Sequence, residues 1–435
     1  MIHSHCNGIP MKPFLQSMPF AASLLLAACS GLPQRETVLP TGPTAGDQVL
    51  SPFYQWNGAL PTRPGVMLRT EPLPLQPELT AAALSQRILY TSTDARWHAG
   101  IVPVSGTLYL PRGTAPKGGW PLVAWAHGTL GVADSCAPSW AQHRPRDATY
   151  LNRWLENGFA VVATDYQGLG GPGPHPYLIW QAEGRSVLDS ARAALAAHPG
   201  RIANEVIITG QSQGSGSSIG ASRIAPEYAP ELTVRAGIAT GVVSSFPDGP
   251  YKLQDASLRA GAPSRFTVLR LIGGSLPDGG PTPDSLMSEK GRAVLQAARN
   301  GCVDDMRAIE QREQVDAGNA FAIEPKRLET MLKPVTDMSL VKIGFPLFLG
   351  TGLADRTLPP RRQYAAAAAL CAAGNAVSWH TYPGITHNGI VNAAFDDELA
   401  FVRRTLRGEA AAGNCQALTE PGAPGTRAPG IRFND

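Results

Sequence analysis

The sequence predicts an α/β fold: a mostly parallel sheet flanked by helices, with an inserted, mainly helical cap domain. The first observation is that short apolar runs alternate with helix-compatible stretches, a pattern typical of βαβ units. The second is that this alternation stops between residues 244 and 343, where helical segments and breakers such as 279–283 replace it. Because a stretch of this length is not a loop, we expect a cap over the carboxyl edge of the sheet, where open α/β sheets bind ligands. A separate, adjacent domain is the alternative.

The expected elements follow one another in chain order. Two runs rich in β-branched and aromatic residues, 87–93 and 101–110, predict an antiparallel strand pair because turn residues separate them. The later elements alternate between strands and helices. The expected strands are 122–126, 159–164, 206–209, 234–240, 345–350 and 377–382, and the expected helices are 150–157, 182–197, the stretch after residue 212, 361–373 and 391–406.

The first residues predict export. Met11 and Lys12 precede an apolar block at 21–28, which is too short to span a membrane and is typical of a signal peptide. Small residues directly before Cys29 resemble a bacterial lipobox, in which Cys29 becomes the lipidated first residue and anchors the protein to a membrane. Ordinary cleavage after Ala28 is the alternative. We expect the protein in the cell envelope, lipid-anchored at the periplasm or outer-membrane face, or secreted.

Composition divides the rest of the chain. Residues 30–50 are rich in Pro, Gly and Thr and predict a flexible tether, while residues 413–435 predict a loosely attached tail unless Cys415 pins its start. The predicted division is a signal peptide with lipobox (1–29), a tether (30–50), a core in two parts (51–243 and 344–412), a cap insertion (244–343) and a C-terminal tail (413–435).

Length and charge exclude some classes of partner. The chain has 435 residues, of which 43% are hydrophobic and 16% charged, as expected for a globular protein with a sizeable core. The net charge is +3 and no basic patch with interleaved aromatic residues occurs, so no nucleic-acid partner is predicted. We expect a monomer.

The cysteines predict disulfides, because export permits them. Apart from Cys6 and Cys29, four cysteines remain, and an even number predicts two bridges with three connectivities open. They are Cys136, Cys302, Cys371 and Cys415. No cysteine or histidine cluster has zinc spacing, so neither a metal nor a cofactor is predicted.

Ser212 lies in the pentapeptide Gly-Gln-Ser-Gln-Gly at 210–214, between the apolar run 206–209 and a helix-compatible stretch. A serine on such a strand-turn-helix is the nucleophile elbow of α/β-hydrolases, and the flanking glycines suit a turn with no room for side chains. A second match at 216–220 centres on Ser218. That serine would lie inside the helix, so we interpret it as a packing residue.

A serine nucleophile needs a base and a group that orients the base, and in this fold they follow in the order acid, then histidine. Only His380 and His387 follow Ser212. His387 lies in a loop and His380 inside an expected strand, so His387 is the predicted base. The predicted acid is Asp355, which directly follows the buried run 346–354, one helix and one strand before His387. Asp337 lies at the wrong end of that run, and Asp396 and Asp397 follow the histidine.

The reaction also needs donors for a developing oxyanion. The backbone N–H of Gln213, directly after the nucleophile, is one predicted donor. The other is the N–H of Gly128 or Thr129, in the loop after the strand 122–126, and His127 is interpreted as a brace of that loop. Asp165 ends another strand, and two roles stay open for it: shaping the acyl pocket or holding a turn.

These residues together resemble the secretory lipase family of α/β-hydrolases, which has fungal and bacterial members. The resemblance covers about residues 85–415 and is carried by 127–129, 136–139, Asp165-Tyr166, the Ser212 elbow, 352–355 and 384–387. It implies a cap at the observed gap, and it implies the disulfides Cys136–Cys302 and Cys371–Cys415. The chain departs from fungal members in its lipobox-like signal and in lacking the Asp that they place in the oxyanion loop, so the second donor stays open.

The expected function is hydrolysis of carboxylic esters, acylglycerols or other lipid esters, through an acyl-enzyme on Ser212. A short-chain carboxylesterase and a serine peptidase or amidase with the same triad are the alternatives among enzymes. A non-catalytic binding protein of the envelope is the alternative outside them.

Overall fold

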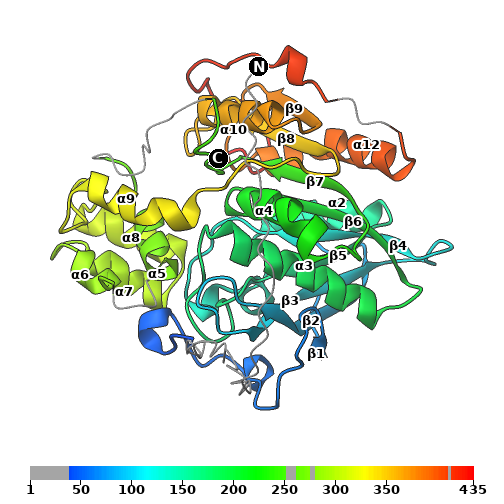
Figure 1. Cartoon of the computed structure of the whole chain (residues 1–435), viewed down its shortest axis with the longest axis horizontal. Helices are drawn as coiled ribbons and strands as arrows, with labels where there is room; N and C mark the ends of the chain where they lie inside the picture. The colour runs from blue at the N-terminus through cyan, green and yellow to red at the C-terminus, as the bar shows by residue number, and fades with distance from the viewer. Residues whose placement is uncertain (1–38, 251–260, 275–279, 410–412) are drawn as a thin grey trace, which may run out of the picture. The chain divides into compact units, whose positions relative to one another are not determined.

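The structure, a computed structural model, describes residues 39–250, 261–274, 280–409 and 413–435, and these fall into one compact unit. They contain a nine-stranded sheet of order β1-β2-β3-β5-β4-β6-β7-β8-β9, which Figure 1 shows with helices around it. Strands β1, β2, β3 and β5 pair antiparallel, and the remaining neighbours pair parallel. The predicted fold class is therefore confirmed.

The strands are β1 Met67–Pro72, β2 Ala82–Thr93, β3 Ile101–Pro111, β4 Trp120–Ala126, β5 Ala160–Thr164, β6 Ile202–Gln211, β7 Val234–Thr240, β8 Leu347–Gly352 and β9 Val377–Tyr382. The α-helices are α1 Pro138–Ala141, α2 Pro145–Glu156, α3 Trp180–Ala197, α4 Gln213–Tyr228, α5 Arg265–Gly273, α6 Pro283–Leu286, α7 Arg292–Asn300, α8 Val303–Glu313, α9 Pro325–Thr336, α10 Pro360–Ala372, α11 Ile390–Ala393 and α12 Phe395–Leu406. Short 3-10 helices are η1 Pro43–Ala45, η2 Pro52–Tyr54, η3 Asp134–Cys136 and η5 Cys415–Ala417.

The central strands are buried on both faces, because their side chains alternate between two apolar clusters. In β4, Leu122 and Ala124 pack with α3 and α4, whereas Val123 and Trp125 pack with α2 and α12. This two-sided burial explains why the parallel strands are continuous apolar runs in the sequence. It also leaves the carboxyl ends of the strands as the place where loops can gather functional side chains.

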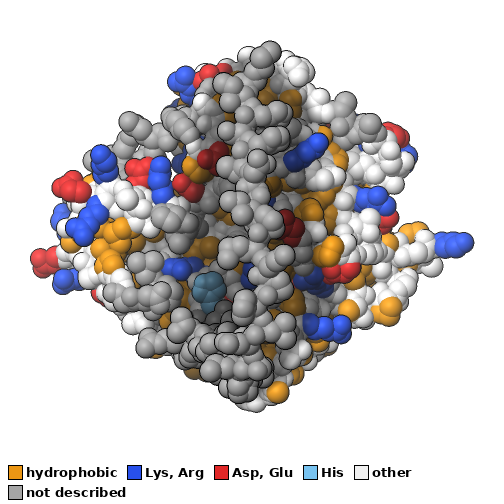
Figure 2. Space-filling view, viewed as in Figure 1, with side chains coloured by type: hydrophobic (Ala, Val, Ile, Leu, Met, Phe, Trp, Pro, Cys, Tyr) orange, Lys and Arg blue, Asp and Glu red, His pale blue; other side chains and the backbone are white. Residues whose placement is uncertain are grey.

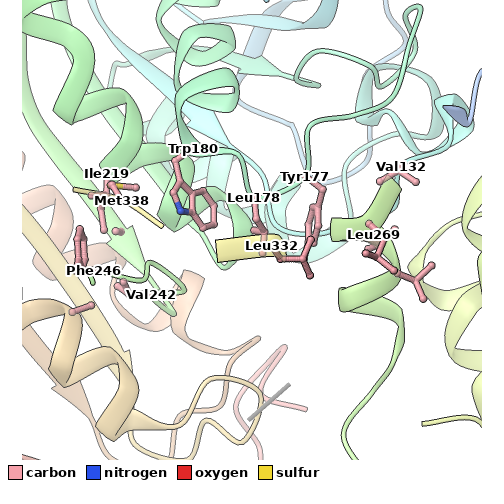
Figure 3. Close-up of a cluster of buried hydrophobic side chains, with 14 of the residues drawn as sticks. Val132, Tyr177, Leu178, Trp180, Ile219, Val242, Phe246, Leu269, Leu332 and Met338 are labelled. Carbon is pink, nitrogen blue, oxygen red and sulfur yellow. The ribbon is translucent and has the colours of Figure 1, made fainter. Parts of the chain in front are cut away.

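Helices α5–α9 lie between β7 and β8 in the chain and gather beside the sheet (Figure 1). They share a buried apolar cluster with the core, in which Leu269 and Leu332 from the helices meet Tyr177 and Trp180 (Figure 3). The Trp180 indole N–H also donates to the backbone O of Thr336 at 2.6 Å. The interruption of the strand–helix alternation thus corresponds to helices packed onto the core.

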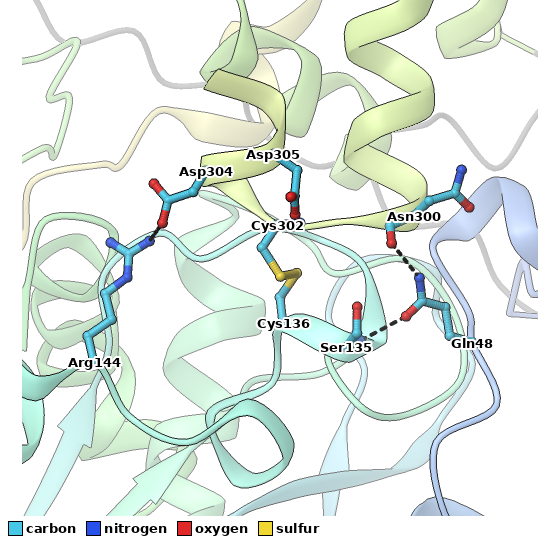
Figure 4. The surroundings of a disulfide bond; sticks show 8 residues. All are labelled: Gln48, Ser135, Cys136, Arg144, Asn300, Cys302, Asp304 and Asp305. Atoms are coloured by element: carbon cyan, nitrogen blue, oxygen red, sulfur yellow. Dashed lines mark hydrogen bonds and ion pairs between the residues drawn. A yellow bond between two sulfur atoms is a disulfide. The ribbon is translucent and has the colours of Figure 1, made fainter. Parts of the chain in front are cut away.

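Two disulfides join Cys136 to Cys302 and Cys371 to Cys415, the pairs that the family resemblance implies. The first links η3, after β4, to the start of α8, and Figure 4 shows its surroundings. An ion pair of 3.2 Å between Arg144 and Asp304 makes a second link between the same regions.

The described part of the predicted tether is packed, which corrects that prediction. The Asp47 carboxylate accepts from the backbone N–H of Gly42 at 2.7 Å and of Gly173 at 2.9 Å. The Gln48 side chain donates to the backbone O of Asn300 at 3.0 Å (Figure 4). A Pro- and Gly-rich composition disfavours helices and strands, but side chains such as Asp47 can still fix such a segment by satisfying its backbone. Residues 1–38, with Cys6 and Cys29, lie outside the described residues.

The C-terminal tail is also held more firmly than its composition predicts. Besides the disulfide at Cys415, the Asn414 side chain accepts from the backbone N–H of Trp379 at 2.8 Å and donates to its O at 2.7 Å. Further along, Asn434 is buried against the loop that carries His387. Of the two alternatives that the sequence left open, a tail whose start is pinned by Cys415 is the one that these contacts fit.

On the face shown in Figure 2, basic and acidic side chains of the described residues are interspersed. Among the described helices, none combines the length and the apolar character needed to cross a membrane.

The disulfide Cys136–Cys302 closes a longer loop than Cys371–Cys415, with sequence separations of 166 and 44. Replacing a pair by alanines is expected to lower the free energy of unfolding by about 2–4 kcal/mol, and the loss should be about 1 kcal/mol larger for the longer loop. Chemical denaturation of the two double variants measures both values. Equal losses would contradict an effect that depends on loop length.

Candidate active site

The turn between β6 and α4 holds Ser212 in a conformation that few L-residues adopt, with φ 57° and ψ −121°. A Cβ at Gly210 would collide with the backbone O of Gly214, and a Cβ at Gly214 with the backbone O of Ala126 in β4. Both glycines are therefore required sterically. A strained residue of this kind costs about 1–3 kcal/mol and persists only where the surrounding structure fixes it.

Three side chains that are far apart in the sequence form one hydrogen-bonded line. Nε2 of His387 lies 2.9 Å from Oγ of Ser212, and Nδ1 of His387 lies 2.7 Å from Oδ2 of Asp355. The structure thus brings together the predicted nucleophile, base and acid. If Nδ1 carries the proton and donates a hydrogen bond to Asp355, the lone pair on Nε2 faces the serine hydroxyl.

Asp355 is fully buried, and four donors surround its carboxylate. Oδ1 accepts from the backbone N–H of Thr357 at 2.9 Å and of Leu358 at 2.8 Å. Oδ2 accepts from His387 and from the side-chain amide of Gln363 at 2.9 Å. These bonds fix the orientation of the carboxylate and, through it, that of the imidazole.

The loop of His387 is supported from the elbow itself. The Gln211 side chain donates to the backbone O of His387 at 2.9 Å and accepts from the Arg146 guanidinium at 3.1 Å. A Cβ at Gly241, which has φ 59°, would lie 2.9 Å from Cε1 of His387. The histidine therefore sits between the end of β7 and the residue before the nucleophile.

The predicted oxyanion donors lie beside Ser212. Gln213 is the first residue of α4, and a backbone N–H at this position has no acceptor within its own helix. A Cβ at Gly128 would lie 3.5 Å from the Ser212 Cβ, so the loop 127–129 runs next to the nucleophile. The Thr129 hydroxyl lies 2.8 Å from the Tyr177 hydroxyl. The arrangement can place two N–H groups around a carbonyl oxygen bound at Ser212.

Residues 142–409 match the sequence model of secretory lipases. This chain belongs to the secretory lipase family.

One curated relative of this secretory lipase family member is Lipase 4 of Candida albicans, which is 35% identical over 111 residues. The match covers 22% of this chain and 23% of that relative. It thus supports common ancestry over a limited part of either protein.

Solved structures resemble this chain in fold over a larger part of its length. Candida antarctica lipase A in its closed state has a TM-score of 0.64 at 18% identity, covering 88% of this chain and 90% of that one. The rice cell wall degrading esterase LipA of Xanthomonas oryzae has a TM-score of 0.57 at 18% identity, covering 79% and 97%. At these identities the comparison bears on the fold alone.

The alternative residues of the sequence analysis lie elsewhere in this secretory lipase family member. The Ser218 hydroxyl is buried in α4 and donates to the backbone O of Ile238 at 2.8 Å. His380 stacks on Phe348, with ring centroids 4.7 Å apart. Asp396 pairs with Arg153 at 2.6 Å. None of these three side chains is within hydrogen-bond reach of the Ser212 hydroxyl.

Asp165 and His127 brace the loops around the site. The buried Asp165 carboxylate accepts from the Ser105 hydroxyl at 2.6 Å and from the backbone N–H of Ser139 at 3.0 Å. Of the two roles left open, these bonds favour the structural turn. Nδ1 of His127 lies 2.8 Å from the backbone O of Gly128, and burial lowers the pKa of this histidine.

A buried polar cluster behind the predicted oxyanion donor was not found from the sequence. Glu183 of α3 is fully buried and accepts from the side chains of Gln213 at 2.8 Å and Ser217 at 2.5 Å. Nε2 of His175 lies 2.7 Å from the same Gln213 amide. Burial raises the pKa of Glu183 to about 7 and lowers that of His175 to about 3. The available signal was an acidic residue on the apolar face of the helix 182–197.

Gln363, Gln211 and Arg146 were also missed as supports of the site. Each is polar and almost fully buried, but nothing in the local sequence separates such a residue from an exposed one. Among the described residues, no group of three or more His, Cys, Asp or Glu side chains is placed to hold a metal ion.

Glu183→Gln is expected to change how stability depends on pH. The pKa of Glu183 is raised from 4.5 to about 7 on folding, so between these values the folded protein keeps a proton that the unfolded chain has lost. Its stabilising contribution is therefore present below pH 4.5 and is lost as the pH rises through about 7. Glu183→Gln should therefore lack this decrease in the free energy of unfolding with rising pH, which is of the order of 3 kcal/mol.

Urea denaturation of both proteins at pH 5 and pH 8 measures this effect. The difference between the two proteins removes the contributions of Glu398 and Asp134, whose pKa values are also raised by burial. If the free energy of unfolding changed equally with pH in both proteins, the raised pKa of Glu183 would be contradicted.

Proposed function

We propose that this secretory lipase hydrolyses carboxylic esters of lipids through an acyl-enzyme formed on Ser212. The observation that carries the proposal is the hydrogen-bonded line Asp355–His387–Ser212, with the serine on a strained turn at the end of a central strand. Membership of the secretory lipase family supports ester hydrolysis as the class of reaction.

In the proposed acylation step, Oγ of Ser212 attacks the ester carbonyl carbon while Nε2 of His387 takes the hydroxyl proton. Asp355 holds Nδ1–H of the imidazole and stabilises the imidazolium that forms, without taking the proton itself. When the tetrahedral intermediate collapses, the bond to the alcohol oxygen breaks and that oxygen takes the proton from Nε2. The alcohol leaves and the acyl group stays on the serine.

In the proposed deacylation step, water replaces the alcohol. His387 takes a proton from the water as it attacks the acyl carbon, and returns this proton to Oγ when the fatty acid leaves. In both steps the oxyanion accepts from the N–H of Gln213 and from that of Gly128 or Thr129. Each preorganised donor of this kind is typically worth about 3 kcal/mol in the transition state.

The choice of lipid esters rests on the apolar surroundings. We propose that residues 244–343 form a cap whose helices cover the site. The described part of this region shares with the core a buried cluster that includes Val242, Phe246 and Leu332 (Figure 3). Val242 directly follows Gly241, where an added Cβ would lie 2.9 Å from Cε1 of His387. A cap with apolar side chains on its inner face favours an acyl chain over a polar peptide.

Ser212→Ala tests the nucleophile. The variant should lower kcat for p-nitrophenyl decanoate by about 10⁴- to 10⁶-fold, because without Oγ no acyl-enzyme can form. Its Tm should not fall, since the hydroxyl is not needed for the turn. A fluorophosphonate probe should label the wild-type protein at Ser212 and leave the variant unlabelled.

Residual turnover near that of the wild type would refute the role of Ser212. Two further substrates separate the lipid-ester proposal from its alternatives. Faster hydrolysis of p-nitrophenyl acetate than of the decanoate would favour a short-chain carboxylesterase. Faster hydrolysis of an aminoacyl anilide than of either ester would favour a peptidase or amidase.

We also propose that the protein is exported and anchored by lipidation of Cys29, on the basis of the lipobox-like residues before it. Expressed in a bacterium that lipidates exported proteins, the wild-type chain should sediment with membranes, and Cys29→Ser should move to the soluble fraction. Incorporation of labelled palmitate into the wild type alone is the second readout. An equal soluble share of both proteins would favour ordinary cleavage after Ala28.

A further inference from the structure

The last residues of the chain lie against the loop that carries His387, and Asn434 makes the closest contacts. Its Oδ1 accepts from the backbone N–H of Thr386 at 2.7 Å. Its Nδ2 donates to the backbone O of Gly384 at 3.0 Å and of Ala428 at 2.9 Å. Only 5% of Asn434 is exposed. One amide thus satisfies backbone groups on both sides of the contact.

Neighbouring residues reinforce this contact. The backbone N–H of Ala428 donates to the O of Gly384 at 2.8 Å. The Asn388 amide donates to the Asp435 carboxylate at 3.3 Å, and its oxygen accepts from Arg146 at 2.9 Å. A Cβ at Gly389 would collide with Oδ1 of Asn434. The residues directly before and after His387 are therefore tied to the tail.

We propose that Asn434 is a positioning residue for the proposed base His387. The inference rests on the proposed triad. Asp355 orients the imidazole itself, and two side chains hold the backbone around it. Gln211 binds the backbone O of His387 from the elbow side, and Asn434 binds the N–H of Thr386 from the tail side. With one support removed, the imidazole can turn or shift while the fold persists. Residues 427–435 lie outside the part of the chain that matches the family.

A shift of this kind acts on rate rather than on binding. The base must stay within hydrogen-bond reach of the serine hydroxyl, and a displacement of about 1 Å can cost about a hundredfold in rate. The Asn434 side chain bonds to backbone groups of Gly384, Thr386 and Ala428. It lies outside the apolar cluster that the proposed cap shares with the core. Its loss is therefore expected to lower kcat while KM for the decanoate ester stays unchanged.

The chain offers a matched control in Asn375, which is also 5% exposed. Its Oδ1 accepts from the backbone N–H of Ile343 at 2.6 Å, and its Nδ2 donates to the O of Val341 at 3.0 Å and of Leu370 at 2.9 Å. The same three kinds of bond thus occur at a buried asparagine that does not contact the His387 loop. Both substitutions by leucine should lower stability for the same reason.

The test compares Asn434→Leu with Asn375→Leu, each measured per active site titrated with a fluorophosphonate. Asn434→Leu should lower kcat by about tenfold to a hundredfold with KM unchanged, and slow the labelling of Ser212 by the same factor. Asn375→Leu should lower Tm but leave kcat unchanged. An unchanged kcat in Asn434→Leu, or the same loss in both variants, would overturn the inference.

A second variant covers the case in which Asn434→Leu does not fold. Gly389 has helical backbone angles, φ −65° and ψ −30°, so Gly389→Ala is compatible with the backbone and acts by displacing the Asn434 amide. It should lower kcat without raising KM, and an unchanged kcat would overturn the inference. Where Asn434→Leu folds, the double variant should lose no more than the larger single loss, because both changes remove one contact. Additive losses would overturn the inference.

Ser212→Ala separates this proposal from the proposed function. If that variant stays active, the triad itself is wrong. If it is inactive while Asn434→Leu keeps full kcat, the triad stands and the role of Asn434 is refuted.

Discussion

The close approach of backbones around the elbow is the constraint on which the rest of the site depends. The carbonyl of Ala126 occupies the space that a side chain at Gly214 would need, and the carbonyl of Gly214 does the same at Gly210. Strand β6 is paired on both sides, so the surrounding sheet can hold Ser212 in a strained conformation. The position of Oγ is then set by the sheet, and only loops have to reach it.

Residues at the ends of strongly patterned strands could be predicted from the sequence. Ser212, Asp355 and His387 each follow an apolar run whose direction places its end at one edge of the sheet, and the structure brings these three together. Their supports could not be predicted in this way. Asn375 and Asn434 make the same set of hydrogen bonds, yet only one lies beside His387, and no local pattern distinguishes them. Composition failed similarly for the described residues of the tether, because it predicts whether a segment forms helices or strands and not which side chains will bind it.

The cluster behind Gln213 bears on the electrostatics of the proposed reaction. A carboxylate near a developing oxyanion opposes it, whereas neutral donors stabilise it. Burial raises the pKa of Glu183 and lowers that of His175, and each shift favours the uncharged form. The Gln213 side chain at the start of α4 is thus hydrogen-bonded to Glu183 and His175. Both groups carry less charge than an exposed glutamate or histidine would.

The first disulfide has a mechanical consequence for the helices between β7 and β8. Cys302 directly precedes α8, and the next residue, Val303, donates its backbone N–H to the O of Leu130 at 2.7 Å. The covalent bond and this hydrogen bond fasten α8 beside the loop 127–129. The other links from helices α5–α9 to the core, such as Arg144–Asp304 and Trp180–Thr336, are non-covalent and can break and re-form. Any displacement of these helices from the core is therefore smallest at Cys302 and at the neighbouring loop that holds Gly128.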